Sequence, residues 1–282
     1  HQLAYMCHKE RLRWSAVLLL VLEGSAPGGV VVFSALVNGK WRVCLQNDSE
    51  TEVRVISGED DPDANAPSLS FDGKSVAFEV QSKGIVVQDI GSDKKRCVQT
   101  GIERQLLRPS WSPKNGEVLC VSYAAAKNGE DSDIVRVNEP TTSVVLVQTG
   151  IQDYPKVSPE GGVVCYTSSS TLSCPRGGVQ IVSQLWVLDL CTGTGRQILL
   201  TTSQDTQPDW SPDGTEIAFA SDRTGKFEIW VVSTDESHIR QITAGDGSKT
   251  WPVWSPDGKS IRFTMVKDGR YSLWIIGIDG KN

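Results

Sequence analysis

A short motif recurs five times along this chain of 282 residues. Each copy begins with proline and passes through a turn into an apolar stretch, as in PDWSPDG at 208–214 and PVWSPDG at 252–258. The lead prolines are Pro67, Pro109, Pro155, Pro208 and Pro252, which are 42, 46, 53 and 44 residues apart. A near-constant period of this length indicates a repeat architecture, in which each unit buries its faces against its neighbours.

The clearest repeat unit predicts four strands. In the fifth unit, segments 215–220, 227–232 and 239–243 are apolar and separated by turn residues, and the short stretch around Pro208 adds one more strand. A sixth, weaker copy at 27–33 keeps the proline and the apolar run. Four-stranded units of this length are propeller blades. We therefore predict an all-β, six-bladed β-propeller of four-stranded antiparallel blades, forming one domain over residues 1–282, with blades starting near residues 27, 67, 109, 155, 208 and 252.

The residues of the repeated turn have physical reasons for their positions. Proline is preset for the first central turn position, aspartate caps its own backbone, and glycine takes the left-handed conformation that reverses the chain. The tryptophans of the motif, Trp111, Trp210 and Trp254, are expected to act as wedges between neighbouring sheets.

The N-terminal segment, residues 1–26, is expected to contribute a strand that closes the ring. Blades two to five each end in a fourth strand before the next lead proline, but the chain stops at Asn282 before blade six can do so. The apolar run 17–22 would then complete blade six, so that no sheet edge stays open. Two other interpretations remain: the same run could be the inner strand of blade one, or part of a secretory signal, which has the same order of basic, apolar and small residues.

Composition argues against several function classes. The net charge of -6, the pI near 5.2 and the absence of basic runs longer than Lys94–Arg96 argue against a nucleic-acid partner. The three histidines, His1, His8 and His238, do not have the spacing of zinc ligands. No G-x-S-x-G elbow occurs, and no apolar run is long enough to span a bilayer. We predict a monomeric protein that is not an enzyme and has no metal or cofactor.

Several motifs together resemble a known family. SPDG before an apolar strand, Ser221–Gly225, Glu228–Trp230 and Arg240–Thr243 are similar to the repeat of TolB-type, PD40 or "WD40-like", propellers, and the resemblance covers residues 27–282. It implies protein–protein binding in the periplasm or another exported location, with a cytoplasmic location as the alternative. The same blade motif occurs in propellers of prolyl-oligopeptidase-type serine peptidases, so this chain could instead be such a propeller without its catalytic domain.

The architecture also predicts where a site would lie. If the strand bearing WSPDG is innermost, its turn lies on one face of the disc, the turn face, and the connections between blades lie on the other, the second face. The mouth of the channel on the second face would gather Asp153, Tyr154, Asp205, Gln207, Asp222, Arg223, Lys249 and Trp251.

Tyr154 and Trp251 are amphipathic side chains of the type that anchors protein interfaces, although packing against a neighbouring blade would also explain them. The insertion 168–178 could be a recognition loop or tolerated surface variation. A protein partner is therefore the first hypothesis. A small ligand or glycan at the same mouth is the second, and an enzyme using its channel is the third.

Overall fold

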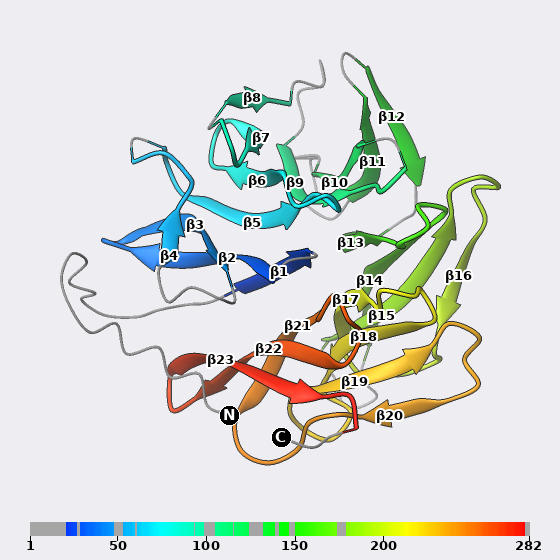
Figure 1. The fold of residues 1–282 in the computed structure, drawn as a ribbon. Helices are drawn as coiled ribbons and strands as arrows, with labels where there is room; N and C mark the ends of the chain where they lie inside the picture. The colour runs from blue at the N-terminus through cyan, green and yellow to red at the C-terminus, as the bar shows by residue number, and fades with distance from the viewer. Residues whose placement is uncertain are drawn as a thin grey trace.

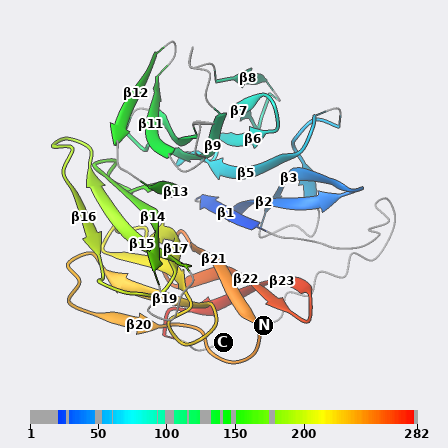
Figure 2. The same cartoon turned by 180° about the vertical axis from the view of Figure 1, so that it is seen from behind.

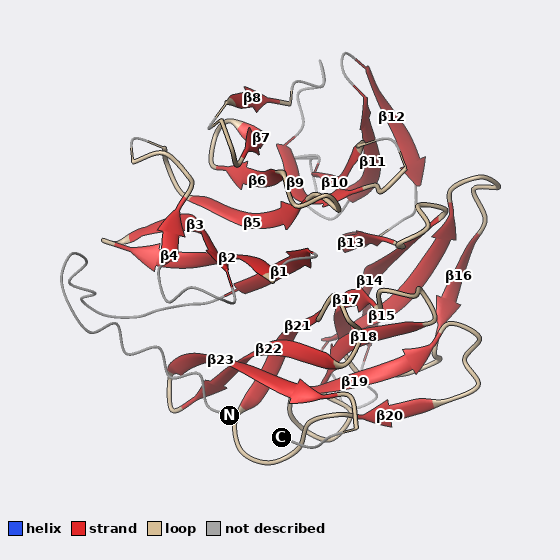
Figure 3. Ribbon diagram, in the orientation of Figure 1, coloured by secondary structure: helices blue, strands red, loops and turns tan. Residues whose placement is uncertain are grey.

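The protein is a six-bladed β-propeller, as a computed structural model shows (Figure 1). The structure describes residues 21–26, 29–47, 53–59, 61–92, 94–98, 105–114, 116–123, 132–138, 141–146, 150–173 and 179–279. Within these ranges, all regular elements are β-strands, grouped into six antiparallel sheets around a central axis (Figure 3). The predicted fold class is confirmed.

Each sheet is one blade. The strands of blades one to three are β1 (Val21–Ala26), β2 (Val30–Val37), β3 (Lys40–Asn47), β4 (Val53–Val55), β5 (Ala64–Leu69), β6 (Ser75–Val80), β7 (Gly84–Asp89), β8 (Lys95–Cys97), β9 (Gln105–Trp111), β10 (Val118–Tyr123), β11 (Ser132–Asn138) and β12 (Thr141–Leu146). Those of blades four to six are β13 (Ile151–Val157), β14 (Val163–Ser173), β15 (Val179–Asp189), β16 (Gly195–Ile198), β17 (Asp205–Trp210), β18 (Glu216–Ser221), β19 (Glu228–Ser233), β20 (Ile239–Gln241), β21 (Ser248–Trp254), β22 (Ser260–Lys267) and β23 (Arg270–Gly277).

Strand order is the same in every blade. Successive strands pair side by side, and the first strand of each sheet lies nearest the axis (Figures 1 and 2). The strands that carry the lead prolines are therefore innermost, as predicted. Blades one to five have four strands, whereas blade six has three among the described residues, β21, β22 and β23.

The described part of the N-terminal strand lies in a different blade from the one expected. Val21 and Leu22 belong to β1, where they pair with Ser34 and Phe33 of β2. They are thus in the inner strand of blade one rather than the outer strand of blade six, and the rest of the run 17–22 lies outside the described residues. The alignment of Pro27 with the other lead prolines was misleading, because β1 ends before Pro27. β1 packs against the inner strands of both neighbouring blades, β5 and β21.

A β-bulge interrupts five of the six inner strands at the lead proline. The residue before each proline has a left-handed backbone, with φ between 48° and 56°, although none of the five is glycine: Ala66, Arg108, Tyr154, Gln207 and Trp251. Proline has no N–H to donate to a strand ladder, so a proline inside a sheet is accommodated at a bulge. The strand pairing shifts register at the same place in all five blades.

The core lies between blades. Trp111 packs with Ala77 and Val87 of the preceding blade, and its indole Nε1 donates to the backbone oxygen of Ser68 at 2.8 Å. Trp210 of blade five makes the equivalent 2.9 Å bond to the backbone oxygen of Lys156 in blade four. Trp111 and Trp210 are therefore wedges whose indoles also hydrogen-bond the neighbouring blade.

The repeated turn is a local hydrogen-bond network. In blade five, the Ser211 hydroxyl donates to Asp213 Oδ1 at 2.6 Å and accepts from the N–H of Glu216 at 2.9 Å. Asp213 Oδ1 also accepts from the N–H of Thr215, and Gly214 has a φ of 71°. Blades two and six repeat the serine–aspartate bond. Hydrogen bonds to the Asp213 carboxylate hold its pKa below its usual value.

Replacing Asp213 tests the turn through its pH dependence. A carboxyl whose pKa is lowered by folding stabilises the folded state above its unfolded pKa of about 4, and this contribution is lost as the pH falls through the folded pKa. Asp213→Ala should therefore lower the thermal unfolding midpoint by a few degrees at pH 7, with a smaller difference at pH 3. An equal difference at both pH values would show that the carboxylate bonds do not stabilise the turn.

Candidate functional site

The bulges give the central channel two rings of side chains. The residues just before the lead prolines form a ring nearer the second face, of which Arg108, Tyr154, Gln207 and Trp251 line one small hollow. The residues just after the prolines form a ring nearer the turn face, namely Ser68, Ser110, Lys156, Asp209 and Val253. We call these the pre-proline ring and the post-proline ring.

Three members of the pre-proline ring form an aromatic cluster, defined as Arg108, Tyr154 and Trp251. The Tyr154 and Trp251 rings meet edge to face, with centroids 5.2 Å apart and planes at 78°. The Arg108 guanidinium carbon lies 4.2 Å from the Tyr154 ring centroid and 5.6 Å from that of Trp251. Both geometries are favourable for aromatic and cation–π contacts. The cluster thus joins blades three, four and six inside the channel, part-way along the inner strands.

Two other candidate residues hold this cluster in place. Asp153 Oδ1 lies 2.6 Å from Nε of Arg108 and accepts a hydrogen bond from the N–H of Tyr154. Burial raises the pKa of Asp153, and the nearby guanidinium opposes that rise. Gln207 Oε1 accepts a 2.9 Å bond from the N–H of Trp251, which ties blade five to blade six.

Three predicted site residues, Asp205, Asp222 and Arg223, lie where the strands of blade five meet the second face, and they make partly buried hydrogen bonds. Arg223 Nη2 donates to both carboxylate oxygens of Asp205 at 2.9 Å, and its guanidinium lies over the ring of Trp230 at 4.8 Å. Asp205 is fully buried, and burial raises its pKa while Ser221 and Arg223 lower it. Asp222 Oδ1 accepts from the N–H of Gln204.

Lys249 is buried as well. Its ammonium lies 3.0 Å from Glu228 Oε1, and the two side chains are 4% and 1% exposed. It also donates to the backbone oxygens of Gly245 and Gly247. Lys249 therefore fixes a loop of blade six against blade five and offers little surface at the channel mouth.

The eight predicted residues thus fall into two groups. Asp153, Tyr154, Gln207 and Trp251 come together in the channel, whereas Asp205, Asp222, Arg223 and Lys249 make bonds within and between blades five and six. Sequence reasoning missed Arg108, which completes the aromatic cluster. Its position just before a lead proline, shared with Tyr154 and Trp251, was the signal that could have found it.

The insertion in blade four is a strand extension. β14 and β15 pair over eleven consecutive positions, and the pairing continues past Ile151, the first residue of β13. The extension therefore projects at the second-face end of the blade, where Ile181 is 58% exposed. The tip of the insertion, 174–178, lies outside the described residues.

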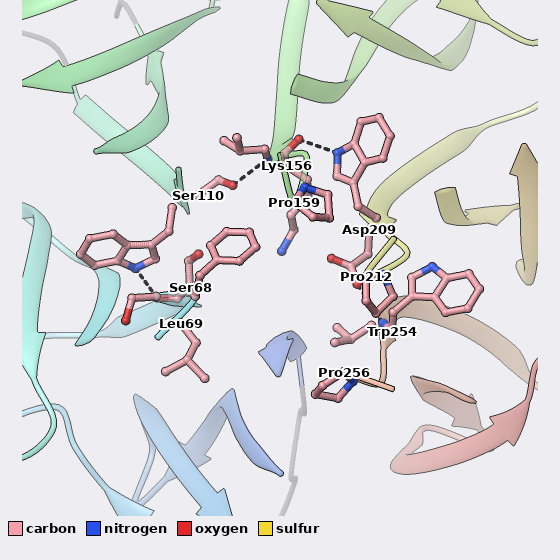
Figure 4. A pocket seen from close by; sticks show the side chains of 15 residues that line it. Ser68, Leu69, Ser110, Lys156, Pro159, Asp209, Pro212, Trp254 and Pro256 are labelled. Atoms are coloured by element: carbon pink, nitrogen blue, oxygen red, sulfur yellow. Dashed lines mark hydrogen bonds between the residues drawn. The ribbon is translucent and has the colours of Figure 1, made fainter. Parts of the chain in front are cut away.

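A larger hollow lies at the opposite end of the channel. This funnel, on the turn face, has a volume of about 290 Å³ and is walled by aromatic and proline side chains of the repeated turns (Figure 4). The post-proline ring lines its inner end. Sequence reasoning placed no site here. The hollow at the pre-proline ring is far smaller, about 20 Å³.

Asp209 is the electrostatically unusual member of the funnel. Burial raises its pKa to about 6, against the opposing charge of Lys156. Its Oδ2 accepts a 2.8 Å hydrogen bond from the N–H of Trp254 in blade six. Among the described residues, no group of three or more histidine, cysteine or acidic side chains could hold a metal ion. Over the same residues, no helix is long and apolar enough to cross a membrane.

Comparison with known proteins identifies the repeat. The family described as the TolB beta propeller domain, PD40, matches residues 176–282. The chain folds as a TolB-like propeller. It is similar to the putative TolB from Agrobacterium tumefaciens, with 21% identity and a TM-score of 0.69 over 82% of both chains. TolB from Acinetobacter baumannii matches with 18% identity and a TM-score of 0.68, over 93% of this chain but 61% of that one.

Enzymes share the same fold. Puromycin hydrolase is 15% identical with a TM-score of 0.66, over 93% of this chain and 46% of the hydrolase. An oligogalacturonate lyase in complex with manganese matches with 13% identity and a TM-score of 0.59, over 88% of this chain and 85% of the lyase. At these identities the likeness to TolB and to the enzymes is one of fold, which does not determine activity.

The buried ion pair of Lys249 provides a test of its structural role. Lys249→Met should destabilise the protein by up to about 3–5 kcal/mol, because the buried Glu228 carboxylate then keeps only the Lys226 ammonium, 3.8 Å away and half-exposed, as a counter-charge. Lys249→Met/Glu228→Gln should cost less than the two single changes combined, as measured by urea unfolding. If the loss of unfolding free energy in the double variant equals the sum of the two single losses, the pair does not interact.

Asp209 should make the folded state less stable as the pH rises. Its pKa of about 6 in the folded protein exceeds the unfolded value of about 4, so stability falls as the pH rises between these values and stays lower above them. Asp209→Asn keeps an oxygen acceptor for the N–H of Trp254 and removes the charge. The variant should therefore unfold at a higher temperature than the native protein at pH 7, and the gain should vanish near pH 4. A gain that does not depend on pH would contradict this.

Proposed function

We propose that this propeller is a non-catalytic protein-interaction module that binds a protein partner at the second-face mouth of its channel. The observation that carries the proposal is the aromatic cluster, to which three blades each contribute one side chain. Tyrosine, tryptophan and arginine are the residues that most often dominate binding energy at protein interfaces. All three members are partly exposed, so each retains surface for a partner.

The size of the hollow favours a protein over a small ligand at this mouth. Small-molecule pockets have volumes of about 300–1,000 Å³, so a hollow of about 20 Å³ leaves no room for a sugar or metabolite. A stable protein interface buries about 800 Å² on each partner. The partner would therefore lie across the second face and contact the extension of β14 and β15 as well as the aromatic cluster.

In this proposal the candidate residues have two roles. Tyr154 and Trp251 contact the partner directly. Asp153 and Gln207 hold the cluster, while the bonds of Asp205, Asp222, Arg223 and Lys249 keep the surrounding loops rigid. Preformed loops lower the entropic cost of binding. The similarity to TolB propellers supports a periplasmic or otherwise exported location, and we propose that the chain works as a single-domain monomer.

The second candidate is the propeller of a larger peptidase. It is favoured by the match to puromycin hydrolase, in which this fold accounts for less than half of the chain. The second face would then contact a catalytic domain rather than a separate partner.

Affinity capture from an extract of the source cells tests the proposal. The immobilised native protein should retain a specific protein, and Tyr154→Ala/Trp251→Ala should reduce its affinity by at least about tenfold, because two anchor side chains are lost. Phe71→Ala is the matched control, since Phe71 is an exposed aromatic residue on the turn face. Circular dichroism would confirm that all three proteins are folded.

Equal retention by the native protein and the double variant would overturn the proposed mouth. Retention of a peptidase catalytic domain, lost in the double variant, would support the second candidate.

A further inference from the structure

The outer edge of blade six differs from that of the other blades. Each of blades one to five ends in a fourth strand that pairs with the third, whereas among the residues that the structure describes no strand pairs with the outer edge of β23 (Figure 1). β23 is eight residues long and carries the apolar run Leu273–Ile276. A long apolar edge strand is a template for pairing with another strand. The edge of β23 is therefore a candidate strand-binding surface.

The fourth strands of four blades share a short motif. In blades one, two, four and five an arginine is followed two positions later by isoleucine or valine: Arg54–Ile56, Arg96–Val98, Arg196–Ile198 and Arg240–Ile242. These four apolar side chains are at most 6% exposed, and each packs into the core between its own blade and the next. The fourth strand thus covers that core with one aliphatic side chain.

Backbone bonds hold this side chain in place. In blade five, the N–H of Ile242 donates to the backbone oxygen of Ile229 in the third strand at 2.8 Å. The hydroxyl of the next residue, Thr243, accepts from the N–H of Ile229 at 2.8 Å. The equivalent bonds of blade one, 2.9 and 3.1 Å long, join Val43 to Ile56 and Ser57. One residue of the third strand therefore receives both the apolar residue and the hydroxyl that follows it.

The arginine of the motif reaches the next blade. Arg54 Nη2 donates to the backbone oxygen of Ile90 at 3.0 Å, and Arg196 Nη2 donates to that of Thr234 at 2.8 Å. Both acceptors come just after the third strand of the next blade. The motif therefore joins two blades through an aliphatic contact and a basic side chain.

In blade six, Leu273 is the residue that would receive such a strand. Phe263 pairs with Trp274 as Phe219 pairs with Trp230 in blade five, so Leu273 corresponds to Ile229. The residues at this position in blades one to five are all 0% exposed: Val43, Ile85, Ile134, Leu185 and Ile229. Leu273 is partly exposed.

The core beside Leu273 is also incomplete among the described residues. The cluster between blades six and one contains Leu273 and three valines of blade one that are only partly buried: Val37, Val53 and Val55. The other five clusters each include an apolar side chain from the fourth strand of the preceding blade. The apolar surface at Leu273 is thus the surface that a fourth strand covers elsewhere in the ring.

We propose that a strand of a partner protein completes blade six. The partner segment is extended and carries arginine, any residue, isoleucine or valine, and then serine or threonine. It pairs antiparallel to β23, with the N–H of its aliphatic residue donating to the backbone oxygen of Leu273 and its hydroxyl accepting from the N–H of Leu273. In strand addition, backbone bonds give affinity and contacts of alternate side chains give specificity.

The motif favours a separate protein over the other sources of a strand. In residues 1–20 the arginines are Arg11 and Arg13, and the residues two positions after them are Arg13 and Ser15. A second copy that paired through β23 would present Arg270, which is followed two positions later by Ser272. Neither carries the aliphatic residue that the position requires. The edge of β23 lies on the outer side of blade six, away from the channel, so this proposal does not rest on the interface at the channel mouth (Figures 1 and 2).

A peptide from the chain itself supplies the probe. Fluorescein-labelled ESHIRQITAG, the sequence of residues 236–245, is titrated into the 282-residue protein and followed by fluorescence anisotropy. It should bind saturably, with a Kd below about 100 μM. A peptide with N-methylisoleucine in place of Ile242 keeps the side chain but loses the N–H, and a peptide with aspartate there keeps the N–H but loses the aliphatic contact. Each should bind at least about tenfold more weakly.

A variant of the protein places the binding at β23. Leu273→Asp should weaken binding of the native peptide at least about tenfold, because a charge replaces the apolar contact. Ile181→Asp is the matched control, since Ile181 is 58% exposed in the extension of blade four, and it should bind as the native protein does. Circular dichroism would confirm that both variants are folded. The N-methylated peptide tests the pairing without any change to the protein, should Leu273→Asp not fold.

Four results would rule the proposal out. Absence of binding at millimolar concentration would mean that the edge accepts no added strand, as when residues of this chain already cover it. Equal binding of the N-methylated peptide would exclude strand pairing, and native affinity in Leu273→Asp would place the peptide elsewhere. A dimer that Leu273→Asp converts to a monomer, measured by light scattering, would show that a second copy occupies the edge.

Discussion

The architecture of the channel depends on one backbone constraint, the proline inside each inner strand. Proline cannot donate to the strand ladder, so each of five strands bulges there and the preceding residue adopts a left-handed backbone. Such a conformation is uncommon for residues other than glycine and costs energy. The bonds between blades compensate for it, as when Gln207 accepts from the N–H of Trp251. The bulge thereby positions the side chains on either side of the proline to line the channel.

Because of the two rings, the two ends of the channel have different physical properties. Toward the second face, Arg108, Tyr154 and Trp251 pack against one another and leave little free volume. Toward the turn face, Lys156 and Asp209 line an open funnel. Because each ring position belongs to a different blade, one substitution changes the chemistry of the channel without disturbing the repeated turn. A rigid repeat can in this way carry functional variation at two positions per blade.

The sequence predicted those features that depend on local pattern. The period of the lead prolines and the alternation of strands and turns were enough for the six blades, and the shared position before proline was enough to single out Tyr154 and Trp251. Features that depend on packing between strands and blades could not be predicted from the sequence. The partners of Asp205 and Lys249 are set by how loops meet between strands, so both residues were taken for surface groups and are buried ion pairs. β1 was misplaced because blade one lacks the repeated turn. Asp209 was missed because its segment was read only as part of a structural turn.

The central claim is that the bulges bring side chains from separate blades together inside the channel. Fluorine NMR of the protein labelled with 5-fluorotryptophan tests this most directly, with the Trp251 resonance among the nine tryptophans assigned from Trp251→Phe. Tyr154→Leu removes a ring that lies edge to face with Trp251 at 5.2 Å. The resonance of Trp251 should then shift more than any other tryptophan resonance. A Trp251 resonance that stays in place while the protein remains folded would contradict the account.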